Sequence, residues 1–270
     1  MDIAKKVSDG RRPEEGRKKI KAAVIGHVHM AKTGGTTLNG ILALNYEKVC
    51  GHKGYSLDYF QANQRFNNTS QGWMKVEDAY SAQHARYNRG RVHPQIMDEI
   101  GYEDCDYISM EANFGWWQRF DKWPRAVELH VPCRESIDYL MSQCNMRGHV
   151  FDCNAQDLAE EVKKCLVAPD RFSFELANKT LHPNFSVKCF DFKHSFTKYI
   201  SHIGNVISKK SITSEYFHRD TNKKRNKSRE CVRENHEVRS KTIEILENSY
   251  DYYSFCKSCL GSKSDLLFFG

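Results

Sequence analysis

A lysine, two glycines and three threonines follow a short apolar segment, Ala22–Val28, near the start of the chain. Backbone N–H groups of a glycine-bearing loop, and of a helix that begins there, can converge on one anion. A lysine adds a full positive charge, and threonine hydroxyls add hydrogen-bond donors. This combination favours a phosphate group of a nucleotide-like ligand. The residues concerned are Lys32, Thr33, Gly34, Gly35, Thr36 and Thr37.

The apolar pattern predicts the elements that position this loop. Ala22–Val28 reads as a buried strand, and Leu38, Ile41 and Leu42 fall on one side of a helix after the loop. The order of residues differs from the Walker A motif, in which the lysine follows the glycines. An ordinary strand-to-helix turn with a surface lysine is the competing interpretation.

A second candidate anion site lies about a hundred residues further along the chain. Ala126–Val131 alternates and predicts a strand, and Ile137–Met146 predicts a helix. Arg134 precedes this helix and Ser142 lies along it, eight residues later. On a straight helix that spacing is about 12 Å of rise, so spacing alone does not bring the two side chains together. An arginine near a helix start, with a serine on a polar face, is the alternative.

The order Lys-Thr-Gly-Gly-Thr-Thr-Leu resembles the 5′-phosphosulfate loop of the Golgi-type carbohydrate sulfotransferases, the heparan sulfate 2-O and 3-O enzymes included. These enzymes use the co-substrate 3′-phosphoadenosine 5′-phosphosulfate (PAPS) and require no metal. The resemblance implies that Lys32 and the loop bind the 5′-phosphosulfate, and that Arg134 and Ser142 bind the 3′-phosphate. Ala31 replaces a frequent proline, and Glu135 follows Arg134 where the family usually has Asp-Pro.

The same resemblance implies a general base. Sulfuryl transfer to a hydroxyl is an in-line displacement that needs a cation on the leaving side, here Lys32, and a base on the acceptor side. Glu111 lies near the end of a predicted strand that begins at Tyr107, and an aromatic segment follows, as around the base glutamate of the 3-O enzymes. A solvent-facing carboxylate is the competing interpretation. Because some relatives use histidine, His84 and His93 are the alternatives.

The implied fold is α/β: a P-loop-NTPase-like three-layer sandwich with a central, mainly parallel sheet flanked by helices. We expect a polar, mobile segment at 1–20, a single sulfotransferase domain at 21–260 and a tail at 261–270. Further predicted elements are a strand at 187–192, helices at 155–166, 196–207 and 237–257, and loops with short helices over 47–100.

The composition favours anionic ligands and an oxidising compartment. Lys plus Arg exceed Asp plus Glu by 7, 41 against 34, which suits an anionic donor and an acidic glycan. Neither zinc-finger spacing nor a basic region leading into heptads points to nucleic acid, and no histidine spacing predicts a zinc site. Ten cysteines favour disulfides, although Cys256-x-x-Cys259 predicts a local disulfide or two free thiols.

Targeting signals leave two locations open. No run of ~20 apolar residues predicts a transmembrane helix, and residues 1–21 lack an apolar signal core. We expect a glycoprotein of the Golgi lumen or secretory pathway if an anchor has been removed, with a soluble cytoplasmic enzyme as the alternative. Sequons that support the secretory route occur at Asn67, Asn68, Asn178, Asn184 and Asn226.

The prediction is therefore a PAPS-dependent sulfotransferase that acts on a hydroxyl of a carbohydrate. Two other classes stay open. A P-loop-type small-molecule kinase would need Mg²⁺ and an aspartate for the metal, such as Asp104 or Asp106. A non-catalytic glycan-binding protein would keep a decayed nucleotide site. The sequence does not predict the oligomeric state or the position sulfated.

Overall fold

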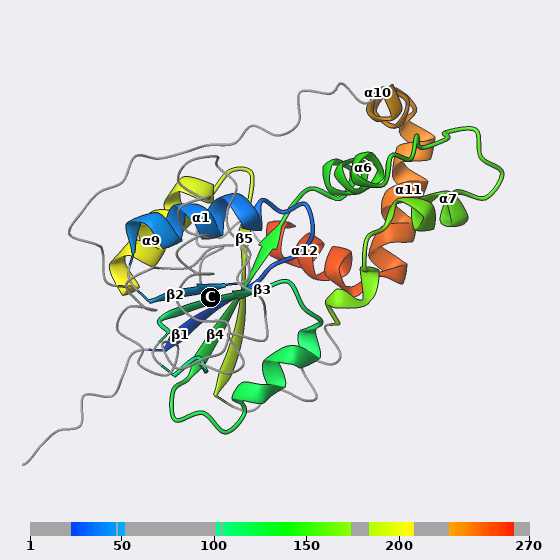
Figure 1. Cartoon of the computed structure of the whole chain (residues 1–270). Coiled ribbons are helices and arrows are strands. Elements are labelled where there is room, and N and C mark those ends of the chain that lie inside the picture. The colour runs from blue at the N-terminus through cyan, green and yellow to red at the C-terminus, as the bar shows by residue number, and fades with distance from the viewer. Residues whose placement is uncertain are drawn as a thin grey trace, which may run out of the picture.

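A sheet of five parallel strands forms the centre of the protein (Figure 1). The computed structural model describes residues 23–46, 48–51, 101–103, 105–173, 184–207 and 227–261. Within them the strand order is β2-β3-β1-β4-β5. The expected α/β class with a parallel central sheet is confirmed. The strands are β1 (Val24–Val28), β2 (Val49–Gly51), β3 (Tyr107–Met110), β4 (Val127–Cys133) and β5 (Phe185–Asp191).

Two helices, α1 (Gly35–Asn45) and α9 (Phe196–Val206), lie side by side over one face of the sheet (Figure 1). Their apolar sides pack on side chains that the strands direct to that face. Ile25 of β1 and Phe190 of β5 belong to this core, and Phe190 stacks on Tyr199 of α9 with ring centroids 3.8 Å apart. Both helices begin after a strand's carboxyl end, so their first turns lie at that edge of the sheet.

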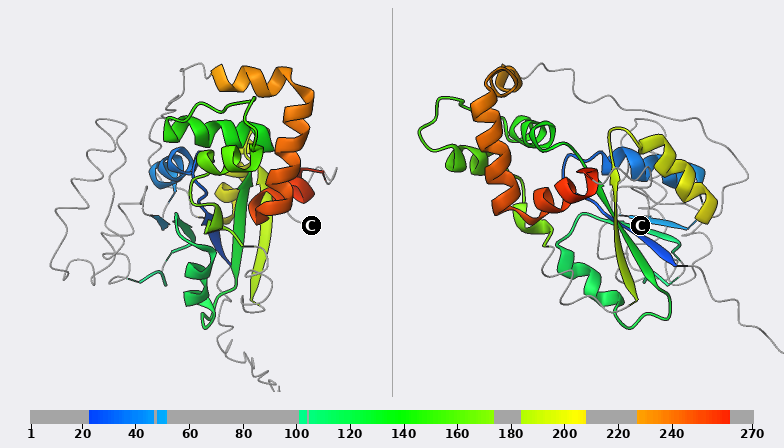
Figure 2. Two further views of the ribbon diagram at one scale, coloured as in Figure 1. Left: turned by 90° about the vertical axis from the view of Figure 1, so that its right-hand side faces the viewer. Right: turned by 180° about the vertical axis from the view of Figure 1, so that it is seen from behind.

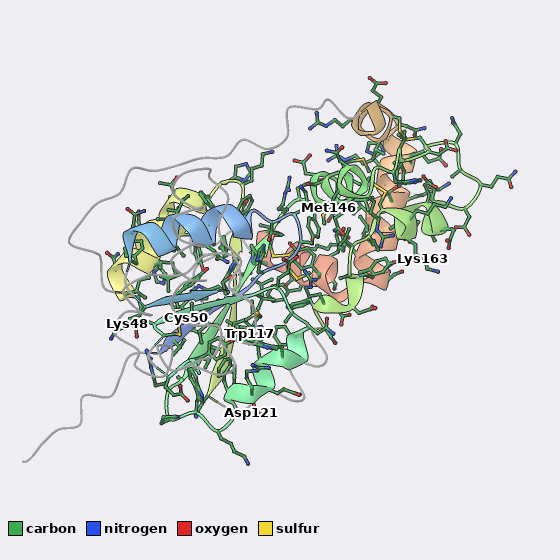
Figure 3. The ribbon with its side chains drawn as sticks, in the orientation of Figure 1. Lys48, Cys50, Trp117, Asp121, Met146 and Lys163 are labelled. Atoms are coloured by element: carbon green, nitrogen blue, oxygen red, sulfur yellow. A yellow bond between two sulfur atoms is a disulfide. The ribbon has the colours of Figure 1, made fainter. Side chains whose placement is uncertain are left out.

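The opposite face is covered by the aromatic segment η1 (Phe114–Phe120), a 3₁₀ helix. Trp117 of η1, labelled in Figure 3, is fully buried against the sheet. A Cβ atom on Gly26 of β1 would lie 2.8 Å from the Trp117 ring and 2.6 Å from Leu129. The indole of Trp117 and the Leu129 side chain occupy the space that a side chain at this position would need, so only glycine fits there.

A group of helices lies beside the carboxyl ends of β4 and β5 (Figure 2). No helix in the described ranges is long and apolar enough to cross a membrane. The group shares one core with the η1 face of the sheet. Its members are α6 (Ser136–Arg147), α7 (Leu158–Cys165), η2 (Pro169–Arg171), α10 (Lys227–Glu234), α11 (His236–Ser249) and α12 (Asp251–Gly261).

All ten cysteines form disulfides, as an oxidising, secretory-type environment allows. The local pairing predicted for Cys256 and Cys259 is wrong, because each binds a different strand. Cys256 and Cys259 are three residues apart, so they lie on one face of α12 with about 5–6 Å between them. Neighbouring strands are ~4.8 Å apart, so the two cysteines can each reach one of the adjacent strands β4 and β5. The pairs are Cys50–Cys105, Cys133–Cys256, Cys144–Cys165, Cys153–Cys231 and Cys189–Cys259.

Several predicted boundaries differ from the structure. The interpretation of 47–100 as loops and short helices missed β2, because three residues are too short to show alternation. The helix predicted at 237–257 is two helices, α11 and α12, which meet at Tyr250 with an extended backbone. The aromatic run after Glu111 is helical, and the β3 strand ends one residue before Glu111.

Buried polar side chains join β1 to β3 within the sheet and β4 to helix α9. His27 Nδ1 lies 2.9 Å from the Ser109 hydroxyl, and His130 Nδ1 lies 3.0 Å from the Tyr199 hydroxyl. Burial, with a smaller contribution from His130, lowers the pKa of His27 to about 3, and burial also lowers the pKa of His130. Both histidines are therefore neutral in the folded protein near pH 7.

Acid is expected to destabilise the fold through His27. A histidine whose folded pKa lies below the unfolded value of about 6.5 binds protons more readily in the unfolded chain. Its contribution to stability is complete above about pH 6.5 and is lost as the pH falls toward the folded pKa. For His27 this loss is about 2 kcal/mol between roughly pH 7 and pH 5. Denaturant unfolding at several pH values measures it.

The His27→Gln variant should flatten this pH dependence, whatever its own stability. His236→Gln is the matched control, because His236 is exposed in the first turn of α11. If the free energy of unfolding of His27→Gln changed with pH as steeply as that of the unaltered protein, His27 would not be the source of the acid destabilisation.

Candidate functional site

The carboxyl edge of the sheet gathers three of the predicted site residues. Lys32 lies in the loop after β1, Glu111 follows β3 directly, and Arg134 follows β4 directly. The chain leaves β1 toward β2 on one side of the sheet and leaves β4 toward β5 on the other. In open parallel sheets, ligands bind in the crevice where neighbouring strands diverge in this way. The crevice between the ends of β1 and β4 is therefore the candidate site.

The loop from β1 to α1 holds a defined conformation. Lys32 has φ of 66° and Gly34 has φ of 72°, both in the left-handed region. Thr33 is buried, and its hydroxyl donates to the Met30 carbonyl at 2.7 Å. The Thr33 backbone N–H donates to the same carbonyl at 3.3 Å. Thr33 thus closes the turn, and its side chain does not face the crevice.

Two aromatic rings pack against the glycines of this loop. A Cβ atom on Gly34 would collide with the Phe192 ring, which follows β5, and one on Gly35 would collide with the His29 ring. His29 is itself anchored, since its backbone N–H donates to the Met110 carbonyl of β3 at 3.2 Å. Packing therefore requires both glycines, and the left-handed backbone conformation adds a second requirement at Gly34.

The first turn of α1 supplies N–H donors toward the crevice. Gly34 is the N-cap and has no side chain to cap the helix, and no acidic residue lies in the first turn. The leading N–H groups of a helix have no intrahelical acceptor and form the positive end of its dipole. Thr36 and Thr37 occupy this turn; the structure describes their backbone positions alone. The arrangement can bind an anion.

Arg134 contacts the loop directly. Its Nη1 donates to the Lys32 carbonyl at 2.8 Å. Burial, and to a smaller extent Arg134, lowers the pKa of Lys32. The charge of half-buried Lys32 is thus disfavoured by burial and by Arg134, and an anion bound between the two cations would relieve that cost.

Ser142 lies on the helix that follows Arg134. It lies half-buried within α6, while Arg134 stands before the Glu135 N-cap and reaches back to the Lys32 loop. Arg134 therefore contacts the Lys32 loop, and Ser142 lies further along the helix.

Glu111 has a partner that sequence reasoning missed. Arg171 of η2 donates to a Glu111 carboxylate oxygen at 3.0 Å, and the two side chains are 17% and 16% exposed for Glu111 and Arg171 respectively. Burial lowers the pKa of Arg171. The ion pair favours the carboxylate form of Glu111 and fixes it at the edge of the crevice. No spacing in the sequence signals this contact, because the partners are sixty residues apart.

Three more cations gather around the start of α6. Lys193 Nζ lies 3.6 Å from Asp138, and an Arg233 nitrogen lies 3.7 Å from the same carboxylate. Arg239 pairs with Glu135 at 3.4 Å. These side chains come from the turn after β5, from α10 and from α11, so only the fold brings them beside Arg134. These three cations and two carboxylates form a cluster of ion pairs at the start of α6.

The aspartates considered for a metal differ in position. Asp106 precedes β3, at the amino edge of the sheet, and pairs with Arg125 at 2.9 Å. It therefore lies at the edge opposite to the Lys32 loop. Asp104, His84 and His93 lie outside the described residues. Within the described part of the chain, no group of three His, Cys, Asp or Glu side chains could hold a metal ion.

A small hollow lies between the loop and α12, lined in part by Met30, Tyr139 and Tyr252. The space inside it, about 230 Å³, is partly open to solvent.

Comparison with known proteins adds no assignment: no family model matches the chain, and neither a curated protein nor a solved structure matches it. The site is therefore interpreted from its own residues.

Proposed function

We propose that this protein transfers the sulfuryl group of PAPS to a hydroxyl group of a carbohydrate. The observation that carries the proposal is the contact of Arg134 with the Lys32 loop, at the crevice between β1 and β4. Two cations and a helix N-terminus without a side-chain cap suit a ligand that carries more than one anionic group. The resemblance of residues 22–46 to a phosphosulfate loop identifies that ligand as PAPS, and with it a P-loop-like sandwich as the finer fold.

In this mechanism the acceptor oxygen attacks sulfur, and the bond from sulfur to the 5′-phosphate oxygen breaks. Negative charge builds on the leaving 3′-phosphoadenosine 5′-phosphate. Lys32 and the first N–H groups of α1, from Gly35 onward, stabilise that charge, because they are in place before the reaction begins. Arg134 binds a phosphate of the donor, with Ser142 as the further ligand that the resemblance implies.

Glu111 is the proposed base that takes the proton of the acceptor hydroxyl. Glu111→Gln is expected to lower kcat by about 10²–10⁴-fold, because the amide cannot accept that proton, with little change in donor affinity. Initial rates and donor titration measure the two quantities. Glu237→Gln, an exposed ion-paired glutamate of α11, is the matched control and should keep full activity. Near-normal turnover of Glu111→Gln would leave Glu111 as a structural partner of Arg171 and favour His84 or His93.

The other two functions make different predictions. A kinase would need Mg²⁺, and the position of Asp106 at the amino edge of the sheet argues against its use for that ion. A glycan-binding protein would bind its glycan without regard to PAPS and would tolerate Lys32→Ala.

Calorimetric titration with 3′-phosphoadenosine 5′-phosphate and with ATP, both without added metal, tests the proposal. We expect binding of the first compound and none of ATP. Arg134→Ala should weaken binding about 10- to 100-fold, because a charge-assisted hydrogen bond contributes about 1.5–3 kcal/mol. Arg147→Ala, at the other end of α6, is the matched control and should bind as the unaltered protein does. Preference for ATP with Mg²⁺ would support the kinase instead.

A further inference from the structure

The sequon Asn184-Phe185-Ser186 lies at the amino end of β5. Asn184 sits in the turn before the strand, and its side chain is exposed. Ser186 is also exposed, while Phe185 between them is half-buried, as the alternation of a strand requires. Both side chains that an N-glycosylation acceptor needs are therefore on the surface of the folded protein.

The cysteines indicate that the chain meets the compartment in which such sequons are modified. All ten are paired, and four of the five disulfides join residues at least 55 positions apart. Bonds of this kind form and persist in oxidising compartments and are rare in the cytosol. The same secretory route carries the machinery that attaches oligosaccharides to asparagine.

We propose that Asn184 carries an N-linked glycan. In the attachment step, the side-chain amide nitrogen of Asn184 forms a bond to the anomeric carbon of an oligosaccharide. The bond from that carbon to a lipid-linked pyrophosphate breaks, the lipid pyrophosphate leaves, and the amide nitrogen loses one proton. The oligosaccharide donor is thus a lipid-pyrophosphate sugar, and no oxidant or reductant is needed.

The glycan would lie far from the candidate site. In the register of β4 and β5, Phe185 pairs with Val127 at the amino edge, and Asp191 pairs with Cys133 at the carboxyl edge. Six residues of strand separate the two ends, about 20 Å at roughly 3.3 Å per residue. Arg134 and the Lys32 loop are at the carboxyl edge, so a glycan on Asn184 leaves the crevice open.

The position also gives the glycan a structural effect. Of the described strands, β5 is the last on its side of the sheet, and Phe190 is its one fully buried residue. The disulfide Cys189–Cys259 ties α12 to the carboxyl half of β5. The amino half is the part that a bulky polar chain on Asn184 would shield. Shielding an outer strand prevents it from pairing with another molecule.

The test is expression of the full chain in eukaryotic cells, directed into the secretory pathway by a cleavable signal. Digestion with peptide-N-glycosidase, followed by mass spectrometry, should show conversion of Asn184 to aspartate. Asn184→Gln and Ser186→Ala should each lose one glycan, while Ser186→Thr should keep it. The second loss variant guards against a folding defect specific to Asn184→Gln.

Two readouts separate this proposal from the proposed enzymatic function. Non-reducing analysis establishes that the disulfides have formed, and titration with 3′-phosphoadenosine 5′-phosphate should give the same affinity for Asn184→Gln as for the unaltered protein. The variant should aggregate faster on concentration. Recovery of the Asn184 peptide without glycan from disulfide-complete protein would overturn the proposal, whatever the outcome of the donor titration.

Discussion

Replacing Lys32 by alanine is expected to lower kcat for sulfuryl transfer by about 10²–10³-fold, as the loss of one donor to developing charge does in other enzymes. Lys32 lies half-buried beside the first turn of α1, where the 5′-phosphate of the donor would gain charge. In the proposed mechanism the lysine acts most strongly in the transition state, so glycan affinity should change little. Release of 3′-phosphoadenosine 5′-phosphate from PAPS, with a panel of desulfated glycosaminoglycan chains as acceptors, measures the effect.

Lys163→Ala is the matched control for this experiment. Lys163 is 71% exposed on α7 and pairs with Glu160 within that helix. Figure 3 shows it among the helices beside the sheet. Its replacement should leave turnover unchanged. Equal losses of turnover and glycan affinity in Lys32→Ala would contradict a role at the leaving group and would favour the glycan-binding alternative.

Removal of the disulfide between Cys133 and Cys256 is expected to destabilise the protein by up to about 5 kcal/mol, from the entropy of a loop of 123 residues. Donor binding should weaken as well. Cys133 directly precedes Arg134, and Tyr252 of α12 donates to the Pro132 carbonyl at 2.6 Å. The disulfide Cys133–Cys256 therefore holds the end of β4 in the position from which Arg134 reaches the Lys32 loop.

The double replacement Cys133→Ala with Cys256→Ala tests this, by denaturant unfolding and by donor titration at a temperature where the variant stays folded. Cys144→Ala with Cys165→Ala is the matched control. That disulfide joins α6 to the end of α7 across 21 residues, so its loss should cost about 3 kcal/mol and leave donor affinity nearly unchanged. Equal effects of the two pairs on donor affinity would show that the α12 connection does not position Arg134.

The strands and helices that carry the Lys32 loop and Arg134 were predictable to within a few residues. β1 and β4 consist of five and seven residues in a nearly continuous apolar or alternating run, and α6 follows a polar turn. Such periodicity reflects burial of one side of an element, which is a property of the local sequence. The position of both loops at the carboxyl edge then follows from the parallel arrangement.

The contacts between these elements were not predictable. Arg171 reaches Glu111 from the short 3₁₀ helix η2, and Cys256 and Cys259 bind two strands that lie earlier in the chain. A side-chain contact across so many residues leaves no periodic pattern, since it depends on how helices and strands pack.

The sequence by itself determined the α/β class with a parallel sheet and, through its cysteines, the oxidising environment; that the Lys32 loop binds an anion stays a prediction from it. Each depends on residue type and near-neighbour spacing. The tertiary structure alone decided that Arg134 bonds to the Lys32 carbonyl, that Glu111 is paired, and that Asp106 faces the other edge of the sheet. Those outcomes depend on strand order and register, because hydrogen bonds between distant segments form only after the sheet has brought their backbones together.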